Sequence, residues 1–267
     1  MYWETFAYSA IAIAVVMLLT WIVSLVKKDV SIVDIVWGPG FVLVAWLSWA
    51  LQPNRTPLQV VMITCITIWG VRLAGYLAWR KKGEGEDRRY GEMREKHGSS
   101  FPLVSLFTVF LLQGVVMWIV SLPLQFGLSS SGMKVAEGVR HALFLTAFLF
   151  WLTGFIFESV ADFQLARFKQ NPENKGKVFD RGLWQFTRHP NYFGDFLVWW
   201  GFGFMSLALS AELWGLLGPL VMSVFLMRIS GVSLLERDLR KRKPAYAEYI
   251  ERTNAFFPSP PKPTEAD

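Results

Sequence analysis

The sequence is poor in the side chains from which disulfides and metal sites are built. Cys65 is its only cysteine, and it has three histidines, His97, His141 and His189. One cysteine cannot form a disulfide within the chain, and a cysteine-based metal site needs more thiolates than are present. The histidines form neither an HExxH pattern nor a cluster. We therefore expect no bound metal and no zinc or di-iron chemistry.

Long polar stretches are also scarce between the apolar blocks. Apolar residues make up 53% of the chain, a fraction that soluble domains also reach, so their arrangement decides the class. They form blocks of about 20 residues, the length that a helix needs to cross about 30 Å of hydrocarbon. Because no water is available there, each segment must pair its own backbone groups. The expected fold is an all-α, polytopic integral membrane protein without a Rossmann domain.

Seven membrane spans are predicted, and the basic residues orient them. The spans cover residues 5–26, 32–51, 58–79, 102–122, 142–160, 193–209 and 213–229. With seven crossings, Lys27, Lys28, the loops 80–96 and 167–188 and the tail beyond Arg228 all fall on one face. The positive-inside rule makes that face cytoplasmic. The formal charge of +6 is then explained by anionic membrane lipids, and we expect no nucleic acid as a partner.

One domain is expected, with its polar motifs gathered near the C-terminal end. We expect a single transmembrane domain over residues 1–257, whose motif-bearing region is about 158–257. Residues 258–267 are Pro-rich and charged, and are predicted to be disordered. The sequence does not determine the oligomeric state.

The most informative polar segment lies where the fifth predicted span ends and the sixth begins. Glu158, Asp162 and Lys169 share one face of a helix, because they are four and seven residues apart. Downstream lie Trp184, Arg188, His189, Asn191, Tyr192 and Asp195. They provide two aromatic rings, a cation, an imidazole, an amide and a carboxylate. With Glu158, Asp162 and Lys169, this set suits a large anionic, partly aromatic ligand such as a dinucleotide, and its members, with Tyr246 further along, are candidate cofactor-binding residues. It also suits an ordinary membrane interface with an aromatic belt, and the residues alone leave both interpretations open.

Polar residues also follow the last predicted span. Arg228, Glu236, Asp238, Tyr246 and Tyr249 lie in this tail, around a run of basic residues. The basic run is typical of an amphipathic helix on anionic headgroups. The acidic residues beside it are less well explained in that way.

Ionisable residues also lie inside the predicted spans. Asp34 lies near the start of the second span, and Arg72 lies in the third, with Tyr76 one turn further on. Charged groups at membrane depth are costly and are usually paired or functional. We expect an Asp34–Arg72 pair, which has either a catalytic role or the structural role of joining two spans.

The chain resembles the steroid 5-alpha-reductase C-terminal family over about residues 32–258. The resemblance rests on SIVDIVWGPG, ADFQLARFKQNP, GLW, TRHPNYFGD and LLERDLRKRKPAYAEY…FFP. It is strongest toward bacterial members that are described only as a domain of unknown function. The C14 and Δ7 sterol reductases are also similar, since they share an RH-x-NY-x-GD element and an RD…Y tail. The resemblance and the lack of sorting signals favour a bacterial inner membrane, with the cofactor site and C-terminus cytoplasmic.

The resemblance implies a reductase that moves hydride from NADPH to an activated carbon–carbon double bond of a lipophilic, steroid-like or prenyl substrate. It implies cofactor contacts at Asp162, Lys169, Trp184, Asn191, Asp238 and Tyr249, and less directly at Arg228 and Glu236. No GxGxxG motif follows a predicted strand. If NADPH binds, helices and loops must therefore hold it.

The candidate catalytic residues depart from the family pattern. Steroid 5-alpha-reductases pair a Glu on an early span with a Tyr on a later one. Here Asp34 replaces the Glu, the Tyr position falls near Trp69, and the nearest phenol is Tyr76, about two turns away. This departure weakens the case for a 3-oxo steroid more than the case for hydride transfer. We expect Asp34 or Tyr76 to polarise a substrate carbonyl, with Arg72 tuning it.

Two other functional classes remain open. One is a SAM-dependent methyltransferase similar to the isoprenylcysteine carboxyl methyltransferases, which share RHPxYxG and a Y…Y…P tail. Those enzymes usually carry Glu–Glu where this chain has Glu236–Arg237–Asp238, and they lack ADFQLARFKQNP. The other is a lipid-binding or scaffolding membrane protein that binds neither cofactor.

Overall fold

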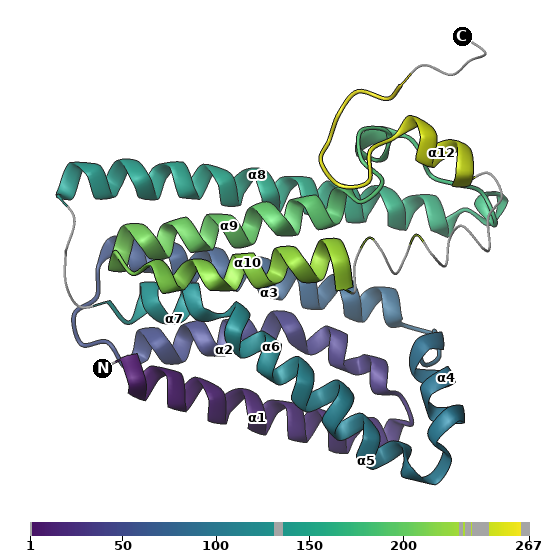
Figure 1. The fold of residues 1–267 in the computed structure, drawn as a ribbon, viewed down its shortest axis with the longest axis horizontal. Coiled ribbons are helices and arrows are strands. Elements are labelled where there is room, and N and C mark those ends of the chain that lie inside the picture. The colour runs from purple at the N-terminus through teal and green to yellow at the C-terminus, as the bar shows by residue number, and fades with distance from the viewer. Residues whose placement is uncertain (1, 131–135, 230–231, 233–235, 237–245, 263–267) are drawn as a thin grey trace. The chain divides into compact units, whose positions relative to one another are not determined.

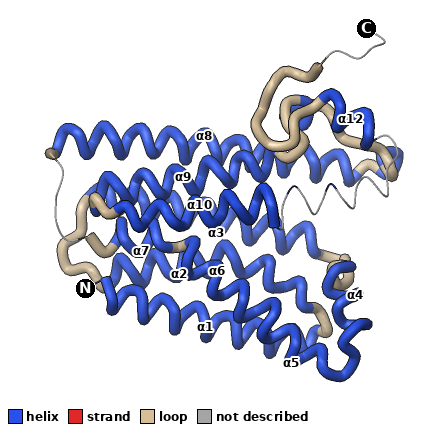
Figure 2. The backbone as a smooth tube through the Cα atoms, in the orientation of Figure 1, coloured by secondary structure: helices blue, strands red, loops and turns tan. Residues whose placement is uncertain are grey.

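The structure is a computed structural model that describes residues 2–130, 136–229, 232, 236 and 246–262. Within these residues every regular element is helical, and no strand is present (Figure 2). The prediction of an all-α protein is confirmed, and the described part contains no Rossmann domain. Asp238 lies outside the described residues, so the expectation for it stays a prediction.

Six helices in the described part are long and apolar enough to cross a membrane (Figure 1). They are Tyr2–Lys27, Val30–Ala50, Pro57–Lys81, Arg88–Val120, Glu137–Gln170 and Pro190–Ser210. They correspond to the first six predicted spans, as expected of a polytopic membrane protein. The seventh predicted span corresponds to the shorter apolar helix Leu213–Ile229.

The chain divides into two compact units. Unit 1 comprises Met1–Phe144 and Met205–Gly218, and unit 2 comprises Leu145–Phe204 and Pro219–Asp267. The candidate catalytic residues all fall in unit 1, and the candidate cofactor residues all fall in unit 2. The single domain expected over residues 1–257 stays a prediction.

Unit 1 is a helical bundle in which α2 packs against both α1 and α3. Its elements are α1 (Tyr2–Lys27), η1 (Val30–Ile32), α2 (Val33–Ala50), α3 (Pro57–Lys81), α4 (Arg88–His97), η2 (Gly98–Ser100), α5 (Phe101–Ser105), η3 (Leu106–Leu111), α6 (Leu112–Val120), α7 (Leu122–Leu128) and η6 (Leu213–Leu216). The α2–α3 contact requires glycine, since a Cβ on Gly38 would lie 2.3 Å from the Gly70 carbonyl oxygen. The backbones of these two helices therefore meet directly.

Local sequence signals explain where α3 begins. Thr56 precedes Pro57, and its Oγ1 accepts a hydrogen bond from the Gln59 N–H at 3.3 Å. The Gln59 Oε1 accepts from the Thr56 N–H at 2.9 Å, which completes a capping box. The Gln59 side-chain amide also donates to the carbonyls of Gly127 and Leu128. One buried glutamine thus caps α3 and ties it to the end of α7.

Unit 2 is built on two long helices that approach each other at glycines. Its elements are the greater part of α8 (Glu137–Gln170), η4 (Pro172–Asn174), η5 (Gly182–Gln185), most of α9 (Pro190–Ser210), the end of α10 (Leu217–Val224), η7 (Phe225–Ile229) and α12 (Tyr246–Arg252). A Cβ on Gly194 would lie 2.4 Å from the Glu158 nitrogen, and one on Gly154 would lie 2.6 Å from the Gly194 oxygen. These glycines bring the start of α9 against the part of α8 that carries the predicted carboxylates.

Helix α8 is longer than the predicted span 142–160. It has 34 residues, about 50 Å at 1.5 Å per residue, and ends at Gln170. The predicted terminators follow at once, since the Asn171 side chain caps η4 and Gly176 has a φ of +85°. Glu158, Asp162 and Lys169 therefore lie on one continuous helix, as predicted.

Candidate functional site

The candidate site in unit 2 begins with two buried carboxylates one turn apart on α8. Glu158 and Asp162 are each 4% exposed. The Asn191 side-chain amide, at the start of α9, donates to Asp162 Oδ1 at 3.2 Å. The Asn191 Oδ1 accepts from the Tyr192 N–H at 3.1 Å, which fixes the orientation of the amide. Lys169 is exposed, about two turns further along α8.

The GLW turn, η5, is bonded directly to α8. The Trp184 indole N–H donates to the Ala161 carbonyl at 3.1 Å, and the Leu183 N–H donates to Gln164 Oε1 at 3.0 Å. Gly182 has a φ of +62°, and a Cβ there would lie 2.6 Å from Gln164 Nε2. The positive φ therefore favours glycine at this position, and a larger side chain would also displace the Gln164 amide.

Tyr249 joins the C-terminal helix α12 to this turn. Its hydroxyl donates to the Trp184 carbonyl, and the side chain is 6% exposed. Burial raises the pKa of the Tyr249 phenol above its ordinary value, so the hydroxyl stays protonated. The Tyr246 ring packs edge-on against that of Tyr249, with 5.6 Å between centroids. Trp184 and Tyr249 therefore form a buried wall beside α8.

Arg188, His189 and Glu236 meet in a buried cluster. The Nε and Nη2 of Arg188 lie 2.8 and 2.7 Å from Glu236 Oε1, and His189 Nε2 lies 3.3 Å from the same oxygen. Burial acts to raise the pKa of Glu236, but contacts with His189 and Arg188 outweigh it and lower that pKa. The carboxylate is therefore ionised at neutral pH. The His189 ring also stacks on Tyr192, with 5.5 Å between centroids.

The remaining predicted cofactor residues are more dispersed. Asp195 is half-buried in α9, and Arg228 is exposed in η7. Among the described residues, no group of three or more His, Cys, Asp or Glu is arranged to hold a metal ion. Unit 2 thus offers the Asp162–Asn191 pair and its aromatic wall as the surface that could receive a nucleotide.

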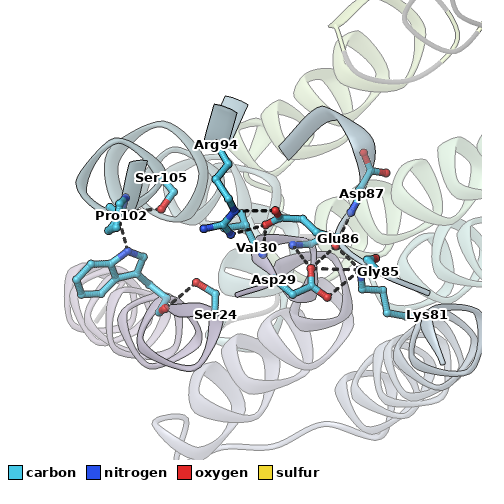
Figure 3. Close-up of polar contacts among 12 residues, drawn as sticks. Ser24, Asp29, Val30, Lys81, Gly85, Glu86, Asp87, Arg94, Pro102 and Ser105 are labelled. Atoms are coloured by element: carbon cyan, nitrogen blue, oxygen red, sulfur yellow. Dashed lines mark hydrogen bonds and ion pairs between the residues drawn. The ribbon is translucent and has the colours of Figure 1, made fainter. Parts of the chain in front are cut away.

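In unit 1, Asp34 lines a pocket of about 310 Å³ whose wall carries charges of both signs. The wall includes Lys81, which pairs with Asp29 at 2.9 Å (Figure 3). It also includes Glu86, whose carboxylate lies 2.7 and 2.9 Å from the Arg94 guanidinium. Burial acts to raise the pKa values of Asp29 and Glu86. The hydrogen bonds and cations at the two carboxylates outweigh burial, so both pKa values lie below the ordinary range. Two ion pairs therefore join the wall residues Lys81 and Glu86 to Asp29 and Arg94.

Tyr76 lies between two arginines on α3. The guanidinium carbons of Arg72 and Arg80, one turn to either side, are each 5.6 Å from the centroid of the Tyr76 ring. These are cation–π distances. The structure therefore brings Arg72 and Tyr76 together as predicted by their spacing, while an Asp34–Arg72 pair stays a prediction.

The sequence interpretation missed residues of α4, because it treated 80–96 as a loop. Arg89 and Tyr90 of this helix lie within electrostatic reach of Asp34. The Gln113 Nε2 donates to the Tyr90 hydroxyl at 3.3 Å, and the Gln113 Oε1 accepts from the Trp37 indole N–H at 2.7 Å. A tyrosine beside a basic run was the available signal, but nothing local connects it with Asp34. Tyr90 is thus a second phenol that could act with this carboxylate.

Taken together, the helices and buried polar groups define a polytopic membrane protein that carries a polar site on the α8–α9 helix pair. Residues 20–253 match the family model described as "Protein of unknown function (DUF1295)", and the chain belongs to this family. An uncharacterized protein of Schizosaccharomyces pombe is 26% identical in a match 266 positions long, which covers 89% of this chain and 75% of that protein. No solved structure gives a significant match.

Two shorter matches are to proteins with named activities. The 3-oxo-5-alpha-steroid 4-dehydrogenase 1 of Mus musculus is 30% identical over 89 residues, which are 33% of this chain and 35% of the mouse protein. The probable O-methyltransferase ustE of Ustilaginoidea virens is 34% identical over 71 residues, 27% of this chain and 25% of that protein. The predicted resemblance to steroid reductases is confirmed, over about a third of the length of the mouse protein.

Proposed function

We propose that the protein is a membrane reductase that uses NADPH to saturate an activated carbon–carbon double bond in a lipophilic substrate. The observation that carries the proposal is the part-buried Asp162–Asn191 contact at 3.2 Å, which joins α8 and α9. A carboxylate and an amide held in one orientation can bind ribose hydroxyls or a carboxamide without rearranging. The partial similarity to a steroid 4-dehydrogenase supports the same class of chemistry.

The residues of unit 2 fit such a cofactor by their chemical types. Asp162 accepts hydrogen bonds, Asn191 donates and accepts them, and Lys169 offers an exposed cation for phosphate about two turns along α8. Trp184 and Tyr249 use their own polar groups within the protein, so we infer that they shape the wall of the site. NADPH, when bound, supplies the hydride.

In this proposal, the candidate catalytic residues supply a hydrogen-bond donor to the substrate carbonyl. Saturation of an enone would require a hydride from the cofactor at the β-carbon and a proton, drawn from water, at the α-carbon. Meanwhile Asp34 or Tyr76 donates a hydrogen bond to the carbonyl oxygen as negative charge develops there. Tyr90 is a third candidate for this donor, since Gln113 fixes its hydroxyl.

A binding experiment tests the cofactor assignment directly. Asp162→Ala and Asn191→Ala should each weaken NADPH binding to purified protein about tenfold or more, which is about 1.4 kcal/mol. Ser159→Ala, on the same stretch of α8, is the matched control and should leave affinity unchanged. NADPH oxidation with a panel of 4-ene-3-oxo steroids and prenyl enones then identifies the substrate. Absence of NADPH binding to the unmodified protein would reject the proposal.

A SAM-dependent methyltransferase is the second candidate. Its specific support is the 34% identity over 71 residues to a probable O-methyltransferase. The two cofactors can be compared in one thermal-shift assay, in which we expect stabilisation by NADPH and none by SAM. The opposite result would favour the methyltransferase. No response to either cofactor would favour a lipid-binding or scaffolding role.

A further inference from the structure

We propose that Arg188, His189 and Glu236 form a clasp that positions the C-terminal segment 246–262, and that they do not contact the nucleotide themselves. The sequence interpretation had placed all three among the cofactor ligands. The proposal deepens the proposed function, on which its nucleotide-binding consequence rests. The clasp itself is a property of the protein without any cofactor.

The first argument is that four of the five donors of Arg188 are already in use. A guanidinium has five N–H donors. Two point at Glu236 Oε1, and Nη1 donates to the carbonyls of Ile250, at 3.1 Å, and Thr253. The arginine is 7% exposed, and its partner Glu236 is 8% exposed. Binding a phosphate through Arg188 would therefore require breaking a buried ion pair, which costs several kcal/mol.

The second argument is that the clasp belongs to a continuous line of hydrogen bonds. Each residue from 184 to 188 forms a hydrogen bond with the C-terminal segment. The Trp184 carbonyl accepts from the Tyr249 hydroxyl, the Gln185 carbonyl from the Thr253 hydroxyl, and the Phe186 carbonyl from the Ser259 N–H. In the other direction, Thr187 Oγ1 donates to the Phe256 carbonyl and the Arg188 N–H donates to the Asn254 carbonyl. The bonds from Ser259, Thr187 and the Arg188 backbone are 2.8–2.9 Å long. The segment therefore lies against residues 184–188 along their whole length.

This line of bonds ends at the candidate nucleotide surface. Trp184, at one end, is bonded to α8 through Ala161. His189, at the other end, stacks on Tyr192, which is the neighbour of Asn191. Loosening the clasp should therefore shift Asn191 relative to Asp162, although neither residue is itself altered.

The variant Glu236→Gln separates a clasp from a ligand, because the two roles predict opposite signs. If Arg188 bound a phosphate, Glu236 would compete with it, and the amide would leave NADPH affinity unchanged or increase it. For a clasp, losing the carboxylate charge weakens the bond to Arg188. We then expect amide hydrogen exchange at residues 188, 259 and 262 to accelerate at least tenfold, and NADPH affinity to fall several-fold.

Glu248→Gln is the matched control. Glu248 lies on α12, is exposed, and is 3.7 Å from Arg252 in an i,i+4 pair, so both measurements should stay unchanged. Arg188→Lys serves if Glu236→Gln does not fold. It keeps a charge that can bind phosphate but cannot make the four contacts, so exchange should accelerate and affinity should fall.

The outcomes remain distinguishable from a failure of the proposed function. Exchange is measured without nucleotide and reports on the clasp alone, whereas titration of the unmodified protein reports on NADPH binding. Unchanged exchange in the variants, or tighter NADPH binding by Glu236→Gln, would overturn the clasp. Faster exchange together with no NADPH binding by the unmodified protein would support the clasp and reject the reductase.

Discussion

At the scale of single residues, several polar side chains of the candidate site are hydrogen-bonded to other groups of the protein. Asn191 pairs with Asp162, Arg188 with Glu236, and the Tyr249 hydroxyl with a backbone carbonyl. Removing one partner leaves the other buried and unsatisfied, which costs more than the hydrogen bond itself contributes. Side chains that look like ligands in the sequence can therefore be structural.

Tyr249 illustrates this cost and gives the first prediction. Tyr249→Phe should lower the free energy of unfolding by about 1–3 kcal/mol at neutral pH, because the Trp184 carbonyl loses its donor. The raised pKa of Tyr249 also means that its contribution is present below about pH 10, the ordinary value of a tyrosine. That contribution is lost as pH rises toward the folded-state pKa. The unmodified protein should therefore lose more stability than the variant above pH 10.

Denaturation in detergent at pH 7 and pH 10.5 measures both effects. Tyr8→Phe is the control, since Tyr8 is 53% exposed and should change neither value. A Tyr249→Phe protein as stable as the unmodified one would show that this hydroxyl contributes nothing.

At the scale of elements, glycine determines how closely helices approach. Gly194 and Gly154 let α8 and α9 touch backbone to backbone, and Gly201 does the same against Trp151. Close approach of this kind stabilises helix pairs in membranes, where the hydrophobic effect between helices is absent. The same contact sets the separation of Asp162 and Asn191.

Gly194→Ala tests this contact. The added Cβ would lie 2.4 Å from the Glu158 nitrogen, so α9 must move, and we expect a loss of about 1–3 kcal/mol. NADPH affinity should fall in parallel. Gly138→Ala on α8 meets nothing within 4 Å and should be neutral or slightly stabilising. Equal melting temperatures for the two variants would contradict a tight α8–α9 contact.

At the scale of the whole molecule, the short helix Leu213–Ile229 decides the topology. Its 17 residues extend about 25 Å, less than the roughly 30 Å of a hydrocarbon core. Local thinning of the bilayer can accommodate this difference at modest cost. The distribution of basic residues predicts that this helix crosses, since otherwise the basic tail would lie opposite the basic loops.

Cysteine labelling tests the crossing, and the single cysteine makes it simple. In a Cys65→Ser background, Glu212→Cys and Lys262→Cys should react with membrane-impermeant reagents from opposite sides. Asn54→Cys should report the same side as Glu212→Cys. Labelling of residues 212 and 262 from the same side would show that Leu213–Ile229 does not cross, and would leave six spans.

The sequence by itself determined the helical class, the first six spans and the end of α8. These features depend on local properties, namely the length of the apolar blocks and the helix-terminating residues Asn171–Pro172 and Gly176. It also singled out Asp162 and Asn191, because they lie in motifs that resemble a family, and their role as cofactor ligands stays a prediction. The extension of α8 beyond residue 160 followed from the shared helical face of Glu158, Asp162 and Lys169 and not from apolar length, which marks only the part of a helix inside the membrane.

Only the tertiary structure decided which polar side chains are already hydrogen-bonded within the protein. Arg188 and Glu236 are 48 residues apart, and Gln113 and Tyr90 are 23 apart, so no local pattern reveals either contact. The tertiary structure also places residues 259 and 262, which lie in the segment predicted to be disordered, in backbone hydrogen bonds. Residues 263–267 of that segment lie outside the described part. A donor is available to a ligand only if no group from elsewhere in the chain has already satisfied it, and folding brings such groups together.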